Sequence, residues 1–377
     1  INSLLGRAVI TLNNPQLEAH FTGKTVLVTG AAGSIGSGLA TALLQHGVGQ
    51  LILLDQAETA LFELEQHFKQ QTSTAFIEYA IGDICDQQRM RKLFEQYTPQ
   101  IIFHAAAYKH VPLMETNPAE AIRNNIGGTQ IMAQLAAEFG AGQFIMISTD
   151  KAVNPTNVMG ASKRIAEMLV TTLNETQRTA YITTRFGNVL GSNGSVIPLF
   201  EKQIASGGPV TLTDERITRF FMTIPEACQL VLEAAVMGNG GEIFVFDMGS
   251  PVKILDLAKK MIRLYGMIPN IDINITYSGL RPGEKLYEEL LNDAENTLAT
   301  YHDKILIAKV REVELSIINE SFNDLRLLVT SASKVSNEME LVGKMKELVP
   351  EFISNNSIFE RLDPSLQTKI LDMTGGG

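Results

Sequence analysis

The chain has 377 residues, of which 45% are hydrophobic, and a formal net charge of −10. This length and apolar content are enough to bury a large core, in one large domain or two smaller ones, and we expect two lobes. The acidic balance argues against nucleic-acid binding, because proteins that bind a phosphate backbone present a broad Lys and Arg surface. An anionic ligand would need a local basic pocket.

The two cysteines, Cys85 and Cys228, lie far apart without Cys-x-x-Cys spacing. They predict neither a disulfide scaffold nor a zinc site, and they favour a reducing, cytoplasmic setting. No apolar run approaches the roughly 18 residues that a membrane-spanning helix needs. The chain starts at Ile1 rather than Met, which is compatible with the loss of an N-terminal segment, including a membrane anchor.

Residues 1–20 resemble an N-terminal arm, and residues 21–186 alternate short β-rich runs with longer amphipathic stretches. This alternation predicts an α/β lobe of the Rossmann type, a doubly wound parallel sheet with crossover helices on both faces. The predicted strands are 25–29, 50–54, 75–81, 101–104 and 143–147. The predicted helices are 35–46, 57–70, 87–96, 118–139 and 157–176.

Beyond Phe186 the sequence becomes rich in Gly, Pro and Asn, with a strand expected near 243–247 and a helix near 254–265. We interpret residues 187–330 as a smaller lobe, mainly for substrate, that can return strands to the sheet. Residues 331–377 read as a polar tail that can be helical but carries no motif.

The first predicted strand leads into a glycine-rich turn at the start of an apolar helix. Its backbone N–H groups and the positive end of the helix would face a diphosphate. Three glycines alone also occur in ordinary turns, but the order strand, glycine turn, helix predicts a dinucleotide site. The candidates for cofactor binding are Gly30, Gly33, Ser34, Ile35 and Gly36.

Asp55 ends the second strand about 20 residues past the glycines, where a carboxylate can accept both ribose hydroxyls and repel a 2′-phosphate. NAD is therefore favoured over NADP, although Asp55 can also be a solvated strand end. Asp83, next to Ile84 after the third strand, either accepts from the adenine amino group or caps the helix that follows Cys85.

Two polar clusters, residues 104–109 and 148–151, follow later strands. The carboxyl ends of the strands are where an open α/β sheet binds its ligand. Ala105 and Ala106 would let a flat cofactor approach closely, although small residues also occur where a strand meets a helix. The second cluster supplies a hydroxyl, an acid and an amine, or else a surface Asp-Lys pair, from Thr149, Asp150 and Lys151.

The glycine turn together with residues 148–163, STDKAVNPTNVMGASK, resembles the extended short-chain dehydrogenase/reductase family. Residues 103–115 and 185–192 resemble its UDP-N-acetylglucosamine 4,6-dehydratases of bacterial polysaccharide and glycan biosynthesis. The similarity extends from about Leu4 to Lys309.

The family carries Tyr-x-x-x-Lys, whose tyrosine deprotonates a sugar hydroxyl while the lysine holds the nicotinamide ribose. Lys163 is present, but Met159 stands at the tyrosine position, and a thioether is neither acid nor base. The same replacement marks larger dehydratases whose catalytic part follows an N-terminal membrane region, which implies the cytoplasmic face of the bacterial inner membrane. The base for the C4 hydroxyl is then Asp150, Thr149 or a water near Lys163.

The resemblance implies that NAD takes a hydride from C4 of UDP-N-acetylglucosamine, water leaves across C5 and C6, and the hydride returns at C6. It assigns the C5 base to Lys151 and the C6 acid to Asp150. An amine acts as a base only if its pKa falls, and we expect burial or a neighbouring cation, Lys109 or Lys163, to lower it.

The UDP end needs positive charge, and Arg281, in a turn with Glu284, is our candidate for the diphosphate. Read without the family, this segment is a charged loop. Asn188 and Val196 match segments that close over the sugar in related enzymes. Lys109 is expected to contact both the cofactor and the substrate.

Glu115 and Asn125 are expected either to line the site or only to brace a helix. We also expect a homo-oligomer and no metal. Two other functions remain open: a nucleotide-sugar epimerase or reductase, which does not need the Asp150-Lys151 pair, and a non-catalytic NAD-binding regulator, suggested by Met159.

Overall fold

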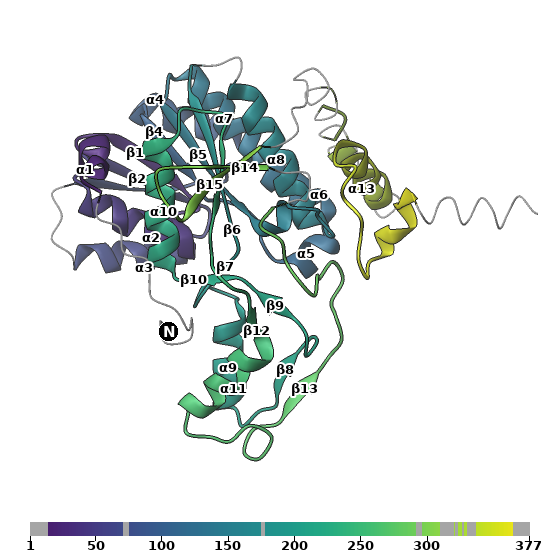
Figure 1. Ribbon diagram of the computed structural model, residues 1–377. Coiled ribbons are helices and arrows are strands. Elements are labelled where there is room, and N and C mark those ends of the chain that lie inside the picture. The colour runs from purple at the N-terminus through teal and green to yellow at the C-terminus, as the bar shows by residue number, and fades with distance from the viewer. Residues whose placement is uncertain are drawn as a thin grey trace, which may run out of the picture.

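The computed structural model describes residues 14–70, 75–174, 178–291, 296–309, 320, 323–325, 328–329 and 337–364. Within these residues the main sheet has nine strands in the order β14-β15-β11-β6-β5-β4-β1-β2-β3 (Figure 1). Neighbouring strands from β3 to β11 run parallel, whereas β15 and β14 are antiparallel additions at one edge. The strands are β1 Thr25–Thr29, β2 Gln50–Asp55, β3 Phe76–Ile81, β4 Ile101–His104, β5 Gln143–Thr149, β6 Ala180–Phe186, β11 Ile243–Phe246, β14 Asn296–Ala299 and β15 Ile305–Lys309.

Helices cover both faces of this sheet because successive strand residues point to opposite sides. Leu27 packs in one core with α4, α7, α8 and α13, while Val26 and Val28 pack in the other with α1, α2, α3 and α10. The predicted Rossmann-type doubly wound α/β class is confirmed. The helices are α1 Pro15–Phe21, α2 Ser34–Gln45, α3 Glu58–Lys69, α4 Gln87–Tyr97, α7 Thr129–Glu138, α8 Val158–Asn174, α10 Ile224–Met237 and α13 Asn337–Leu348.

The strand β6 lies between β5 and β11, although the sequence did not predict it. Thr183, Thr184 and Arg185 are buried in it. A central strand with three consecutive buried polar residues lacks the apolar run by which such strands are usually found.

The helix predicted at 118–139 is not continuous. It begins as α6 (Pro118–Ala121), widens into the π-helical segment η2 (Ile122–Gly128) and ends as α7. Asn125 lies in η2, and its side chain bonds both the N–H and the carbonyl of Tyr108 as well as the Ser162 hydroxyl. Such wide turns are frequent at functional sites, and here the turn braces the segment after β4.

A smaller lobe with its own hydrophobic core projects from the carboxyl ends of the strands, at the bottom of Figure 1. It includes the predicted helix at 254–265, which is confirmed as α11. Its elements, with the short strands that link it to the main sheet, are β7 Asn188–Val189, α9 Val196–Ala205, β8 Val210–Leu212, β9 Thr218–Arg219, β10 Phe221–Met222, β12 Val252–Lys253, α11 Ile254–Leu264 and β13 Ile275–Tyr277.

Residues 337–364 fold back onto the main lobe beside α6 and α8 (Figure 1). They comprise α13 and the 3₁₀ helix η4 (Ile358–Leu362), and Met345, Phe352 and Phe359 are fully buried in the core shared with α8. None of the helices in the described ranges is both long and apolar enough to cross a bilayer.

Candidate active site

Two adjoining cavities open at the carboxyl ends of β1, β4 and β5. The larger has a volume of about 510 Å³ and the smaller about 160 Å³. Strand β1 lies between β2 and β4. The chain continues from β1 to β2 and β3 on one side of β1 and then crosses to β4 on the other side, so this crevice is the topological switch point of the sheet. The cavities form one groove, because both are lined by Gly30, Gly33, Ala105, Ala107 and Tyr108.

The glycine turn lies directly against the segment that follows β4. Gly30 has φ +64°, and a Cβ there would lie 2.7 Å from the backbone nitrogen of Ala106. A side chain at residue 30 would therefore be strained twice, by the left-handed backbone and by the contact. The remaining predicted residues of the turn, Gly33, Ser34, Ile35 and Gly36, all line the larger cavity.

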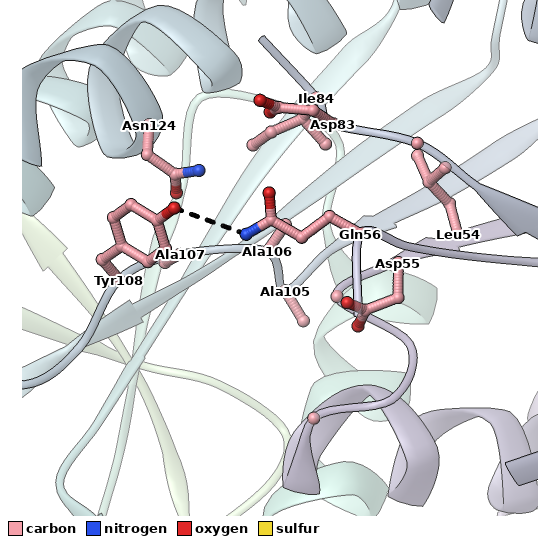
Figure 2. Close-up of a pocket in the computed structure, with 13 residues that line it drawn as sticks. Leu54, Asp55, Gln56, Asp83, Ile84, Ala105, Ala106, Ala107, Tyr108 and Asn124 are labelled. Atoms are coloured by element: carbon pink, nitrogen blue, oxygen red, sulfur yellow. Dashed lines mark hydrogen bonds between the residues drawn. The ribbon is translucent and has the colours of Figure 1, made fainter. Parts of the chain in front are cut away.

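Asp55 lines the smaller cavity (Figure 2). Its two carboxylate oxygens accept hydrogen bonds from the N–H groups of Ala32 and Ala57, both at 2.9 Å. Across the cavity, the Gln56 amide donates to the Tyr108 hydroxyl at 3.4 Å. The carboxylate is thus fixed in place with lone pairs to spare for a ligand hydroxyl.

Asp83 and Ile84 line the same cavity, but Asp83 does not cap the next helix. Asp86 does so by accepting from the Arg89 N–H. The Asp83 carboxylate instead accepts from the Cys85 N–H at 2.9 Å and from Arg123 at 3.0 Å. Partial burial opposes its ionisation, but these two donors hold the pKa of Asp83 below its ordinary value.

His104 is a fully buried brace behind the groove. Its Nδ1 lies 2.9 Å from the Thr29 hydroxyl and its Nε2 lies 2.9 Å from the Thr129 hydroxyl, which donates to the Asn125 carbonyl. Burial, with the nearby charge of Lys163, lowers the pKa of His104 to about 3. The imidazole is therefore neutral and supports the backbone around the groove instead of exchanging protons.

The predicted catalytic residues follow β5, which ends at Thr149 and continues as a 3₁₀ turn, Asp150–Ala152. Thr149 and Lys151 line the larger cavity, and 18% of the Lys151 side chain is exposed. Asp150 is fully buried beneath them and does not belong to the lining. Its Oδ1 accepts from Lys151 Nζ at 3.0 Å and from the Thr149 hydroxyl at 2.9 Å.

The expectation that burial or a neighbouring cation lowers the pKa of Lys151 is wrong for this structure. Burial does act in that direction, but the carboxylates of Asp150 and Glu288 outweigh it and raise the pKa of Lys151 above its ordinary value. Lys151 Nζ lies 3.8 Å from Glu288 Oε1 and 3.2 Å from Asn188 Oδ1. At neutral pH the amine of the ligand-free protein is therefore an ammonium group.

Glu288 and Arg219 are the charged residues of this cluster that the sequence analysis missed. Glu288 Oε1 lies 3.8 Å from both Lys151 Nζ and Arg219 Nε. Burial and the charge of Asp150 both raise the pKa of Glu288. The nearby cations, Lys151 and Arg219 among them, act in the opposite direction but do not outweigh them. In the described part of the chain, Asp150 Oδ2 and Glu288 Oε2 are buried without a hydrogen-bond partner. Within Lys285-Leu286-Tyr287-Glu288-Glu289, nothing marks Glu288 as buried.

Met159 and Lys163 extend from α8 into the larger cavity. The sheet, the neighbouring helices and α13 surround α8, so both side chains are almost fully buried. Burial lowers the pKa of Lys163 to about 8, although Glu167 acts in the opposite direction. About a tenth of Lys163 is therefore an uncharged amine at pH 7, and the rest is an ammonium group.

In the cofactor-free protein, we expect Lys163→Met to unfold at a higher temperature than the wild type at about pH 7, because the variant no longer buries an ammonium group. The cost of burying the ammonium group is complete below the folded pKa of about 8. It fades as the pH rises toward the ordinary pKa of 10.5, because between these two pKa values only the unfolded chain holds the proton. The difference in Tm should therefore shrink as the pH rises above about 8. Circular dichroism melts at about pH 7 and about pH 9.5 measure it, and a difference that grows with pH would contradict the assignment.

Two residues predicted to bind the substrate, Lys109 and Asn188, line the larger cavity. Lys109 Nζ donates to the Asn193 carbonyl at 2.8 Å, and the Asn193 N–H donates to the Ser34 hydroxyl at 3.0 Å. The loop before α9 is thereby tied to both the glycine turn and the segment after β4. Partial burial and the charge of Lys151 lower the pKa of Lys109.

Val196, Arg281 and Glu284 are not part of the cavity lining. Arg281 is 57% exposed and pairs with the mostly buried Glu284 at 3.1 Å. The charge of Arg281 nevertheless reaches the groove, where burial, Lys109 and Arg281 together lower the pKa of His110. Arg281 therefore lies beside the groove, with Glu284 bracing the turn that carries it. No group of three His, Cys, Asp or Glu side chains within the described ranges could hold a metal ion.

Two relatives match most of the chain. Capsular polysaccharide biosynthesis protein CapD of Staphylococcus aureus is 51% identical over 82% of this chain and 52% of its own length. The UDP-N-acetylglucosamine 4,6-dehydratase (inverting) of Campylobacter jejuni is 36% identical over 74% of this chain and 80% of its own length. The chain therefore spans about half the length of CapD, but most of the length of the dehydratase.

Solved structures share the fold. Pen from Bacillus thuringiensis superposes with a TM-score of 0.72 at 35% identity, covering 78% of this chain and 92% of Pen. DesIV, a dTDP-glucose 4,6-dehydratase from Streptomyces venezuelae solved with NAD, superposes with a TM-score of 0.58 at 21% identity, covering 68% and 88%. The second similarity shows the Rossmann-type fold alone.

A family model described as "Polysaccharide biosynthesis protein" matches residues 26–310, from β1 past the last strand of the sheet. The resemblance drawn from the glycine turn and residues 148–163 is thereby confirmed at the level of the family. The chain belongs to this polysaccharide biosynthesis family, whose members share the short-chain dehydrogenase/reductase type of fold.

Proposed function

We propose that the chain catalyses the NAD-dependent 4,6-dehydration of UDP-N-acetylglucosamine to a UDP-4-keto-6-deoxy-N-acetylhexosamine. The observation that carries this proposal is the Asp150-Lys151 pair, with Lys151 in the same groove as the glycine turn. Elimination of water needs a base that removes the C5 proton and an acid that protonates the C6 oxygen. A C4 epimerase changes neither C5 nor C6 and needs no such pair. The dehydratase of Campylobacter jejuni, at 36% identity, supports the same reaction.

The groove fits NAD. Its smaller cavity contains Asp55 and Asp83 and has no Lys or Arg among its lining residues, which suits an adenosine with free ribose hydroxyls better than one with a 2′-phosphate. Its larger cavity extends from the start of α2, where backbone N–H groups suit a diphosphate, to Lys163. Bound here, NAD supplies the acceptor and donor of the hydride.

We assign the C5 base to Lys151, which requires its extra proton to move along the 3.0 Å hydrogen bond to Asp150. A bound sugar that excludes water favours this transfer, because low polarity penalises the charged form of both groups. The uncharged amine then takes the C5 proton. The route from Asp150 to the C6 oxygen runs through the Thr149 hydroxyl, which bonds Asp150 and lines the groove.

The proton of the C4 hydroxyl needs another acceptor, since Met159 has no acid or base function. We assign it to a water beside Lys163, whose pKa of about 8 leaves part of the amine uncharged near neutral pH. Arg281, beside the groove, is our candidate for the UDP diphosphate, with Lys109 and Asn188 near the sugar.

We expect Met159→Ala to reduce turnover by less than about fivefold, because a thioether that exchanges no proton only packs. Initial rates with UDP-N-acetylglucosamine, at equal NAD occupancy, measure the effect. A much larger loss of rate, with circular dichroism and bound NAD unchanged, would contradict a packing role.

Incubation with UDP-N-acetylglucosamine in heavy water, followed by mass spectrometry and NMR, tests the proposed function. The expected product has lost one water, carries a C4 ketone and has exchanged its C5 proton with solvent. A C4 epimer without C5 exchange would identify an epimerase instead. Binding of NAD without any conversion would identify a regulator.

A further inference from the structure

Residues 353–357, the C-terminal strap, lie between two segments that flank the groove. The strap follows α13 and lies outside residues 26–310, which the family model matches. Its preceding anchor is Phe352, fully buried, and its own Ser354 accepts from Lys346 at 2.9 Å. Lys346 also pairs with Asp363, so α13 and η4 hold the strap from both ends.

On one side the strap pairs with the loop that follows Lys151. The Ile353 N–H donates to the Pro155 carbonyl at 3.1 Å, and the Asn355 N–H donates to the Thr156 carbonyl at 3.2 Å. These bonds are made by the backbone, so they fix the path of the strap whatever its side chains are.

On the other side the strap holds the turn at residues 280–284. The Asn355 carbonyl accepts from the Gly283 N–H at 2.7 Å, and its side-chain amide donates to the Glu284 carbonyl at 2.7 Å. Asn356 donates to the Leu280 carbonyl at 2.6 Å. The turn that carries Arg281 is therefore gripped by two consecutive asparagines.

The three segments meet at Gly283. Its carbonyl accepts from the Thr156 hydroxyl and the Asn157 amide, both at 3.0 Å, and its N–H donates to the strap. It has φ +77°, and a Cβ there would lie 2.5 Å from the Asn157 Cβ. Only glycine fits this junction without displacing the loop after Lys151.

The end of the strap also reaches α8. The Ser357 hydroxyl donates to Glu115 Oε2 at 2.6 Å, and Glu115 Oε1 accepts from the Val158 N–H at 2.6 Å. Val158 is the first residue of α8, the helix that carries Met159 and Lys163. One five-residue segment thus contacts, directly or through Glu115, three elements of the candidate site.

We propose that the C-terminal strap positions the nucleotide-sugar site, and that Asn355 is its principal positioning residue. Its amide holds the 280–284 turn, and with it Arg281, at a fixed place relative to Lys151. Loss of the amide removes the bond to the Glu284 carbonyl and loosens the turn, while the backbone bonds of residue 355 and the bond from Asn356 to Leu280 remain. This inference rests on the proposed function, because it assigns the turn to the UDP end of the substrate.

The test uses Asn355→Ala and Asn355→Asp in the full chain, with Ile358→Ala as the control because Ile358 is 59% exposed just beyond the strap. Aspartate keeps the size of the side chain but cannot donate to the Glu284 carbonyl. We expect roughly a tenfold rise in KM for UDP-N-acetylglucosamine in both Asn355 variants, with kcat changed less than about twofold. Calorimetric titration with UDP alone should show a similar loss of affinity, while NAD content and Tm stay near the wild type.

Each outcome separates the two proposals. A wild-type chain that binds UDP but does not convert UDP-N-acetylglucosamine removes the proposed reaction, and the UDP titration of the variants still decides the role of the strap. An active wild type with unchanged KM and UDP affinity in both variants overturns the strap proposal. A wild-type chain that binds no UDP also overturns it. The same holds if a lower Tm and a lower NAD content of the variants account for the whole rise in KM.

Discussion

Lys151→Ala is expected to lower turnover of UDP-N-acetylglucosamine by about a thousandfold or more, while NAD stays bound. Lys151 lines the larger cavity and contacts Asp150, Asn188 and Glu288. Its removal takes away the proposed C5 base without touching the glycine turn.

Initial rates and the NAD released on denaturation measure this prediction, with Lys260→Ala on the exposed face of α11 as the control. Lys151→Arg addresses the concern that alanine leaves the buried Asp150 and Glu288 without a countercharge. A guanidinium keeps the charge but does not give up its proton, so this variant should fold and remain inactive. Near-normal turnover in either Lys151 variant would remove the base assignment.

Gly30→Ala is expected to weaken NAD binding at least about tenfold, and turnover should fall with it. The added Cβ would lie 2.7 Å from the Ala106 nitrogen, in the wall that both cavities share. Relief of this contact moves either the glycine turn or the segment after β4, and both line the groove.

Gly23→Ala is the matched control for this variant. Gly23 also has a positive φ, +71°, but a Cβ there would meet nothing within 4 Å. The two variants thus share the backbone strain and differ in the contact with Ala106. Equal NAD affinity of the two variants, measured by calorimetry, would show that the close approach at Gly30 is unimportant.

The sequence predicted the first five strands of the sheet closely, because their apolar runs are bounded by clear turn residues. It failed at β6, where Thr183, Thr184 and Arg185 replace the apolar residues of a central strand. Arg185 is tolerated there because it pairs with the buried Glu167 of α8 at 2.7 Å. That partner lies 18 residues earlier on a different element, so the local pattern of β6 does not indicate the pairing.

For the site, the glycine turn and the Thr149-Asp150-Lys151 run could be read directly, since neighbours in sequence leave a strand end together. Arg281 and Glu284 were also singled out, but the structure leaves them outside the cavity lining. Adjacency in sequence determines which side chains leave the same strand end together. It does not determine how close a loop from a distant part of the chain comes to the cavity.

The sequence by itself determined the Rossmann-type class, the glycine turn and the pair of an acid and an amine, because each depends on residues close together in the chain. Only the tertiary structure decided the charge of that amine and the contacts of residues 353–357 with the 280–284 turn. Glu288, distant in sequence, helps to keep Lys151 protonated, and Asn355 holds the turn of Arg281. Desolvation, Coulomb interactions and long-range hydrogen bonds act through space, so they exist only once the chain has folded.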